Sequence, residues 1–231
     1  MKKIVITQSN YIPWRGYFDL INASDEFVFL DEVQFTRRDW RNRNRLIFND
    51  KITWLTIPLK NKGNYFQKIK NMETTSNNWI SDHLNKIGSY YSRATYYKSI
   101  FKLLRNIYEQ CLENNLSKIN RHFIYELCEI LKIKTKFIES NKILQHNEDD
   151  PSKRILSICL ERNANYYLTG LKAKQYLNTK IFEEKNIKII WFDYGESKKY
   201  DQVGSSKFVK DLSIIDCLFN CGVNKNLFLN S

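Results

Sequence analysis

The sequence predicts an α/β fold with a mainly parallel, Rossmann-like sheet and a helical insertion or cap. Two observations predict it: short apolar strands alternate with helical patterns at both ends of the chain, and most of the middle is helical in pattern. A chain of 231 residues can bury one apolar core, so we expect a single domain over residues 1–231 with a helical insertion over residues 72–133.

The first elements follow a strand, loop, helix, strand pattern. Residues 3–7 are typical of a short buried strand, residues 16–22 of a helix and residues 26–30 of a second strand. Strands joined through a helix are usually parallel, so residues 8–14 and 31–35, which follow the two strands, should leave the sheet at the same edge. Ligands of α/β sheets bind at that edge.

A hairpin and three helices are expected in the middle of the chain. Asn49-Asp50 is a favourable turn between strands at residues 46–48 and 51–57, and Pro58 should end this antiparallel excursion. Three series with a spacing of four then predict three helices: Trp79, His83 and Ile87; Ile100, Leu104 and Tyr108; Ile119, Phe123 and Leu127.

The α/β pattern returns in the last third of the chain. The expected elements are strands at residues 135–139, 166–169 and 187–192, and helices at residues 152–161 and 212–219. Pro151 marks the start of the first of these helices, and Gly222 should close the second. No repeat or linker divides this region from the rest, so it should complete the same sheet.

The composition predicts a cytoplasmic protein without membrane insertion. No window holds 18 consecutive apolar residues, the N-terminus lacks a signal-peptide pattern, and the five cysteines form no CxxC pair. Patterns for a P-loop, a dinucleotide fingerprint, a nucleophile elbow and a zinc protease are missing, so no tightly bound cofactor or metal is indicated. Glu148-Asp149-Asp150 could hold a divalent cation, but an acidic helix start explains it more simply.

The chain is strongly basic, with a formal net charge of +12 and an isoelectric point near 9.4. Such a charge attracts anions such as nucleic acid, nucleotide sugars or an anionic membrane leaflet. A coding bias towards Lys and Asn would produce the same bulk charge. Charge alone therefore does not choose among these partners.

Polar and aromatic side chains suited to ligand binding follow the first predicted strand. Gln8 and Asn10 can both donate and accept hydrogen bonds, and Tyr11 and Trp14 can stack on a ring. The alternative is a strand-to-helix turn closed by apolar packing. Later in the chain, Gly170 ends a predicted strand, which fits either a tight turn or the close approach of a ligand.

A second segment, residues 31–45, is dense in arginine. Five arginines fall within nine positions around a tryptophan, whereas lysine dominates the rest of the chain. Guanidinium groups suit phosphate or carboxylate, and the tryptophan suits a base or sugar; a salt-bridged surface is the alternative. The candidate binding residues here are Gln34, Arg37, Arg38, Trp40, Asn42, Arg43 and Asn44.

His83 is the histidine with a possible chemical role. An unperturbed pKa of about 6.5 suits a general base, although a hydrogen-bonded core histidine is the alternative. His122 and His146 are expected at the surface.

Spaced motifs along nearly the whole chain resemble the WbqC-like family. They are residues 8–18, 31–35, 40–44, 54–58, Trp79 with His83, residues 167–170, Tyr200 with Gln202, and residues 212–216. The sequence departs from the family pattern at Ser9, where Pro is usual, and at Arg41, where Gln is expected. The resemblance implies a setting in bacterial O-antigen or capsule gene clusters, and it adds Gln202 to the candidate binding residues.

These features together predict an acyl- or aminoacyltransferase that forms an amide on a nucleotide-linked deoxyamino sugar. The arginines would hold the diphosphate, and His83 or Asp31 would accept the proton of the attacking amine. The acyl donor could be a charged tRNA or a carrier protein. A nucleic-acid-binding module that uses the Arg and Trp run, or a glycosyltransferase of the same pathway, are the alternatives.

Overall fold

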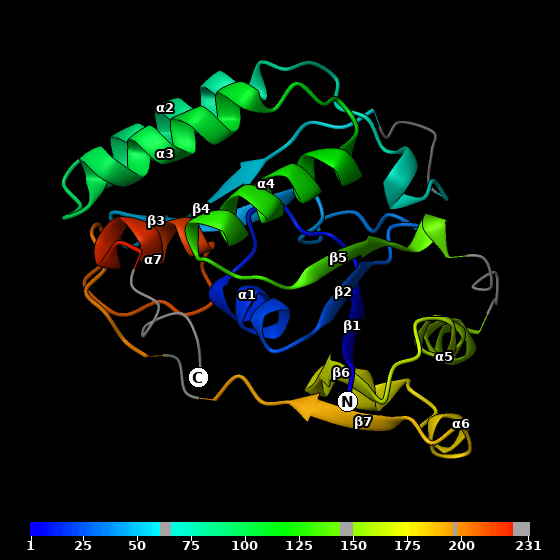
Figure 1. Cartoon of the computed structure of the whole chain (residues 1–231). Helices are drawn as coiled ribbons and strands as arrows, with labels where there is room; N and C mark the ends of the chain where they lie inside the picture. Colours follow the sequence, from blue (N-terminus) through cyan, green and yellow to red (C-terminus); the bar gives the residue numbers. More distant parts are fainter. Residues whose placement is uncertain (61–65, 144–149, 196–197, 224–231) are drawn as a thin grey trace.

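A five-stranded parallel sheet forms the centre of the molecule (Figure 1). The computed structural model describes residues 1–60, 66–143, 150–195 and 198–223. The sheet contains β1 (Lys3–Thr7), β2 (Glu26–Phe29), β5 (Lys136–Glu139), β6 (Tyr166–Gly170) and β7 (Lys188–Phe192). Its order is β5-β2-β1-β6-β7, and every pair of neighbours is parallel, which confirms the predicted α/β fold.

The strand order reverses beside the first strand. From β1 the chain builds outward through β2 to β5, and it then returns to place β6 and β7 on the other side of β1. Such a reversal is the topological switch point at which α/β sheets bind ligands, beyond the carboxyl ends of the strands. The residues that follow β1 and β6 therefore lie where the fold favours a site.

Helices cover both faces of the sheet. On one face, α1 (Arg15–Asn22) and α4 (Leu116–Ile130) pack on alternate strand residues such as Val5 and Phe27, and on the other face α5 (Pro151–Glu161) and α6 (Lys180–Glu183) pack on Ile4 and Val28. The strand alternation explains this division, because successive side chains of a strand point to opposite faces.

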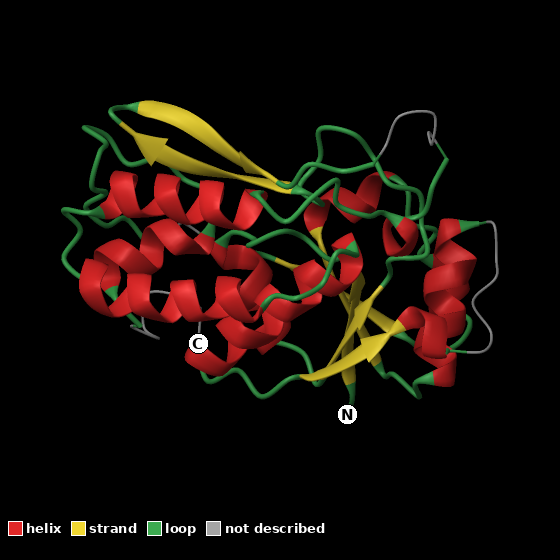
Figure 2. Cartoon of the chain, turned by 90° about the horizontal axis from the view of Figure 1, so that it is seen from above, coloured by secondary structure: helices red, strands yellow, loops and turns green. Residues whose placement is uncertain are grey.

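The helical region forms between the hairpin and β5. It contains α2 (Trp79–Tyr91), α3 (Tyr97–Gln110) and α4, and the three predicted series are buried along them. The apolar side chains of these series share one core with the α1 face of the sheet. The helices thus pack on the side of the sheet that α1 covers (Figure 2).

The hairpin consists of β3 (Arg43–Phe48) and β4 (Lys51–Thr56) and lies against the helical region (Figure 2). Asn49 and Asp50 both have positive φ angles, 48° and 59°, as the predicted two-residue turn requires. β3 begins three residues earlier than predicted, because Arg43 already pairs with Thr56.

Short helices complete the chain. The 3-10 turns η1 (Ile69–Asn71), η2 (Ser140–Lys142) and η3 (Leu171–Gln175) connect larger elements, and α7 (Ile214–Cys221) ends at Gly222 with a φ of 67°, as predicted. Among the described residues, no helix is both long and apolar enough to cross a bilayer.

Candidate functional site at the carboxyl edge of the sheet

The loop after β1 is held rigidly at the switch point. The buried Asn44 donates from Nδ2 to the carbonyls of Tyr11 and Ile12, at 3.0 and 2.9 Å, and the Tyr11 amide donates to the Trp40 carbonyl at 3.1 Å. Ile12 has a φ of 37°, which is uncommon for a branched residue. These bonds explain how the loop keeps that conformation.

Arg41 holds the two amide side chains of this loop. Its Nη2 donates to Gln8 Oε1 at 3.0 Å, and its Nη1 donates to Asn10 Oδ1. Asp39 adds an ion pair at 3.6 Å. Gln8, Asn10 and Arg41 are all half-buried, so a ligand can reach them.

The arginine also determines which way the amides face. A guanidinium group only donates, so the oxygens of Gln8 and Asn10 must point to Arg41 and their NH₂ groups must point elsewhere. Neither NH₂ group has a hydrogen-bond partner within the described part of the chain. The cluster of Gln8, Asn10 and Arg41 therefore presents donors and a positive charge, which suits a ligand rich in anionic oxygen.

Tyr17 is hydrogen-bonded to the donor cluster and lies within electrostatic range of an aromatic wall. Its hydroxyl donates to the Gln8 carbonyl at 2.9 Å. Burial raises the pKa of Tyr17 well above its usual value, Asp31 raises it further, Arg41 lowers it, and Tyr194 contributes a small further increase. The phenol of Tyr17 thus lies within electrostatic range of both sides of the site.

The aromatic wall consists of Trp14 and Tyr194, whose ring centroids are 4.9 Å apart. Two glycines allow it to form. A Cβ on Gly16 would lie 2.3 to 2.7 Å from the Trp14 ring, and a Cβ on Gly170 would lie 3.3 Å from the Tyr194 hydroxyl. Gly170 therefore acts by admitting the tyrosine at the end of β6.

Asp19 is a buried carboxyl beside this wall. It is 5% exposed, and its Oδ1 has no hydrogen-bond partner in the described residues. Burial raises the pKa of Asp19 to about 7, although the nearby cations Arg15 and Lys198 lower it. Asp19 in turn contributes to the raised pKa of Tyr194, about 12, for which burial is the main cause. A carboxyl group that titrates near neutral pH can exchange protons with a substrate.

Asp31 lies in a structural network beneath the site. Its Oδ1 accepts from the Ser9 amide at 2.8 Å, and its Oδ2 accepts from the Ser117 hydroxyl of α4. Asn120 extends the network by donating to Ser9 Oγ at 3.1 Å. Both carboxylate oxygens are thus occupied, and Asp31 joins the ends of β1 and β2 to α4.

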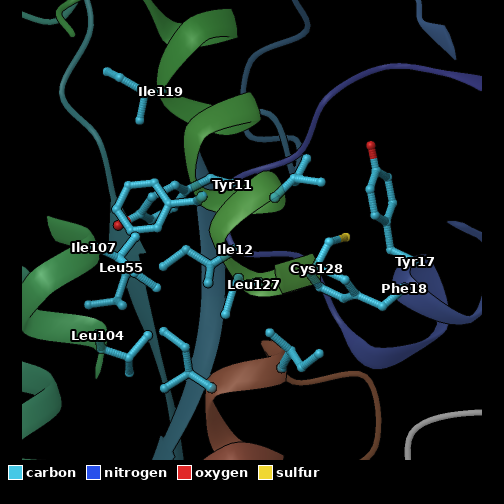
Figure 3. Packing of buried hydrophobic residues seen from close by; sticks show 14 of the residues in the cluster. Tyr11, Ile12, Tyr17, Phe18, Leu55, Leu104, Ile107, Ile119, Leu127 and Cys128 are labelled. Atoms are coloured by element: carbon cyan, nitrogen blue, oxygen red, sulfur yellow. The ribbon is translucent and has the colours of Figure 1, made fainter. Parts of the chain in front are cut away.

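Tyr11 lies in the core, contrary to the prediction that it stacks on a ligand. Its ring is completely buried among apolar side chains that include Leu55 and Ile107 (Figure 3). Its hydroxyl lies 2.6 Å from the Tyr108 hydroxyl and 2.9 Å from His83 Nδ1. The aromatic residue offers no surface to a ligand in this arrangement.

His83 has the geometry of the core alternative. The Thr56 carbonyl, 3.3 Å from Nε2, can only accept, so Nε2 carries the proton and Nδ1 accepts from Tyr11. Burial lowers the pKa of His83 to about 4, which keeps the ring neutral at pH 7. The structure thus places both predicted proton acceptors, His83 and Asp31, in structural networks instead of at the donor cluster.

The side chains of the arginine-rich segment lie in several different places. Gln34, Arg37 and Arg38 are exposed, and Arg41 belongs to the donor cluster. Arg43 packs over Trp54 on the hairpin, outside the cluster. The remaining candidates of this segment are placed as follows: Asn42 donates to the Ile57 carbonyl, Asn44 holds the first loop, and Trp40 lies against Trp54.

Comparison with known proteins decides the family. The model of the WbqC-like protein family matches residues 8–227. The chain belongs to the WbqC-like family. It is also 38% identical over 222 residues to the uncharacterised protein Rv1507c of Mycobacterium tuberculosis (strain ATCC 25618 / H37Rv), covering 96% of this chain and 95% of the relative. No solved structure matches the chain.

Gln202, a WbqC-like motif residue, lies in a different buried network. Its Nε2 donates to Asp216 Oδ2 at 2.8 Å, and the same carboxyl group accepts from Tyr200 at 2.7 Å and from Tyr91 at 2.9 Å. Burial raises the pKa of Asp216. The network fixes α7, whose leading Ser213 bonds to the Ile12 carbonyl at 2.8 Å. This motif of the family therefore supports the first loop indirectly.

Two recesses lie away from the donor cluster. The larger, about 640 Å³, runs along β7 and α6 and is lined by Thr179, Glu183, Asn186, Ile187, Lys188, Ile189 and Trp191. A narrow one beyond Trp14, about 20 Å³, holds little more than one water. Neither recess is lined by Gln8, Asn10 or Arg41, the polar residues of the donor cluster.

Two residues of this candidate site, Tyr17 and Asp19, were not among the candidates from the sequence, and Arg41 was included only as one of the five arginines of residues 31–45. Arg41 carried a signal, since it stands where the family is expected to have Gln. Tyr17 and Asp19 carried no such signal, because a tyrosine and an aspartate in a short amphipathic helix look like ordinary core and surface residues.

The remaining sequence candidates lie elsewhere. His146, Glu148 and Asp149 lie outside the described residues. Asp150 caps α5, because its side chain accepts a hydrogen bond from the Lys153 amide at 2.9 Å.

Proposed function

We propose that this WbqC-like protein is an acyl- or aminoacyltransferase that forms an amide on the amino group of a nucleotide-linked deoxyamino sugar. The observation that carries the proposal is the donor cluster of Gln8, Asn10 and Arg41 at the topological switch point. Two NH₂ groups without a partner in the described residues, beside a guanidinium, match the oxygens of a diphosphate. The O-antigen or capsule setting implied by the family supplies such a substrate, and the reaction would take place in the cytoplasm.

The remaining groups of the site suit the other parts of the substrate. Trp14 and Tyr194 offer aromatic surface for the base or the sugar ring. Burial raises the pKa of Asp19 to about 7, close to neutral pH, so this carboxyl group could accept a proton there. In this proposal Asp19 takes the role that was predicted for His83 or Asp31.

The proposed reaction needs only the amino sugar and the acyl donor as reactants. The sugar amine attacks the acyl carbonyl carbon, the new C–N bond forms, and the C–O bond of an ester donor or the C–S bond of a thioester donor breaks. Asp19 accepts the proton of the amine and returns it to the departing oxygen or sulfur. The donor would be a charged tRNA or an acylated carrier protein.

Mass spectrometry of the nucleotide sugar tests the proposal. The protein is incubated with nucleotide-linked 3-amino- or 4-amino-deoxyhexoses and either charged tRNA or acyl-carrier donors, and the nucleotide sugar should gain the mass of one acyl group. Asp19→Asn should abolish that gain and leave the dissociation constant of the sugar within about twofold, because Asn keeps the shape of the side chain. Binding of the nucleotide sugar without a mass gain from either donor class would refute the transferase and leave only the binding site.

A further inference from the structure

The outer face of the hairpin carries aromatic and cationic side chains that the donor cluster does not use. Arg45 is paired directly with Trp54 across the two strands, and Arg43 lies two positions before Arg45 on the same face. The alternate residues Asn44 and Leu46 are buried on the opposite face. The period of two along each strand therefore directs the arginines and the tryptophan away from the core.

These side chains form a continuous row with Trp40. The Arg43 guanidinium lies 4.0 Å from the centre of the Trp54 ring, the rings of Trp54 and Trp40 are 5.6 Å apart at 34°, and the Arg45 guanidinium lies 5.1 Å from Trp40. Trp40 is 37% exposed and Trp54 is 36% exposed. We call Arg43, Trp54, Trp40 and Arg45 the hairpin row.

The two arginines of the row have no acidic partner in the described part of the chain. Arg43 Nη2 donates to the Arg38 carbonyl at 2.5 Å, and Arg45 Nη2 donates to the Asp211 carbonyl at 2.9 Å. The neighbouring carboxylate, Asp39, pairs with Arg41 instead. Each guanidinium is thus held against a ring with its charge uncompensated, so the complementary partner is an anion.

We propose that the hairpin row binds unpaired nucleotides of single-stranded RNA. Exposed tryptophans provide stacking surfaces that accept any base, and arginines beside them neutralise the phosphates that link successive bases. A neutral glycan could stack on the tryptophans but would leave the arginines without a partner. The net charge of +12 adds attraction at long range. The proposal concerns a surface separate from the donor cluster and does not depend on the transferase reaction.

Fluorescence anisotropy with a fluorescein-labelled 12-nucleotide oligouridine tests the proposal on the full chain. Trp40→Ala combined with Trp54→Ala should weaken binding at least tenfold, because two stacking surfaces are lost. Arg43→Gln should reduce the slope of log affinity against log salt by about 0.7, the contribution of one phosphate contact on a single strand. Arg105→Gln removes the same charge from an exposed position of α3 and serves as the control.

Three results would overturn the proposal. Unaltered affinity of the double tryptophan variant, with the melting temperature close to that of the wild type, would show that the row is not the site. Loss of RNA binding in Arg41→Ala, with the row variants intact, would move the RNA to the edge of the sheet. Salt-independent binding of a neutral oligosaccharide to the row, with no RNA binding, would assign the surface to glycans.

Discussion

Replacing Asp19 with a residue that cannot ionise should raise the free energy of unfolding at neutral pH and leave it nearly unchanged in acid. The carboxyl is 5% exposed and has a pKa of about 7 in the folded chain, against 3.8 for an ordinary aspartate. Below pH 3.8 both folded and unfolded states hold the proton, so burial has no electrostatic cost. As pH rises towards 7 the unfolded state ionises first, and the free energy of unfolding falls.

The size of the effect follows from the shift in pKa. A difference of roughly three pKa units at about 1.4 kcal/mol per unit gives at most about 4 kcal/mol. Asp19→Asn cannot ionise, so its free energy of unfolding relative to wild type should rise by about 2–4 kcal/mol between pH 4 and pH 8.

Urea unfolding at pH 4, 6 and 8 measures this difference. Asp82→Asn, at an exposed position of α2, controls for the loss of one negative charge. An equal change in the free energy of unfolding of Asp19→Asn at pH 4 and pH 8 would show that the Asp19 carboxyl has an ordinary pKa and is not perturbed by burial.

Two further substitutions test the geometry around the loop after β1. Tyr11→Phe removes the hydrogen bonds to His83 and Tyr108 and should lower the free energy of unfolding by about 1–3 kcal/mol, measured by urea unfolding, with ligand affinity unchanged because the ring is buried. Loss of ligand binding with unchanged stability would instead put Tyr11 in the site. Gly16→Ala should displace the Trp14 ring, since the new Cβ would lie 2.3 Å from it, and should therefore alter the near-ultraviolet circular dichroism while changing stability by less than about 1 kcal/mol. An unaltered spectrum would mean that the ring is not held against the helix.

The strands of the sheet could be predicted because their chemistry is local. An Ile-Val-Ile run before a polar loop and an amphipathic helix predicts β1 and α1 whatever lies around them. The start of β3 could not be predicted in the same way. Its first residues, Arg43 to Arg45, alternate charged and amide side chains, and only the pairing with β4 makes them a strand.

The site was harder to predict because burial and partners depend on distant parts of the chain. Asp31 at a strand end would look the same whether it met a substrate or the Ser117 hydroxyl 86 residues later. Tyr11 and Trp14 belong to one motif, yet the first is enclosed by helices from the middle of the chain and the second remains half-exposed. Local composition singled out the loop that the fold places at the topological switch point, but it could not sort the side chains of that loop.

Isothermal titration of nucleotide-linked amino sugars, and of their parent nucleoside diphosphates, into wild type and Arg41→Ala tests whether the donor cluster binds ligand. The wild type should bind, and Arg41→Ala should lose at least tenfold in affinity, because the variant loses one charged donor and the orientation of Gln8 and Asn10. Arg93→Ala, at an exposed position after α2, should bind like the wild type. Equal affinity of Arg41→Ala and wild type for every ligand that binds would contradict the assignment of the site to the carboxyl edge of the sheet.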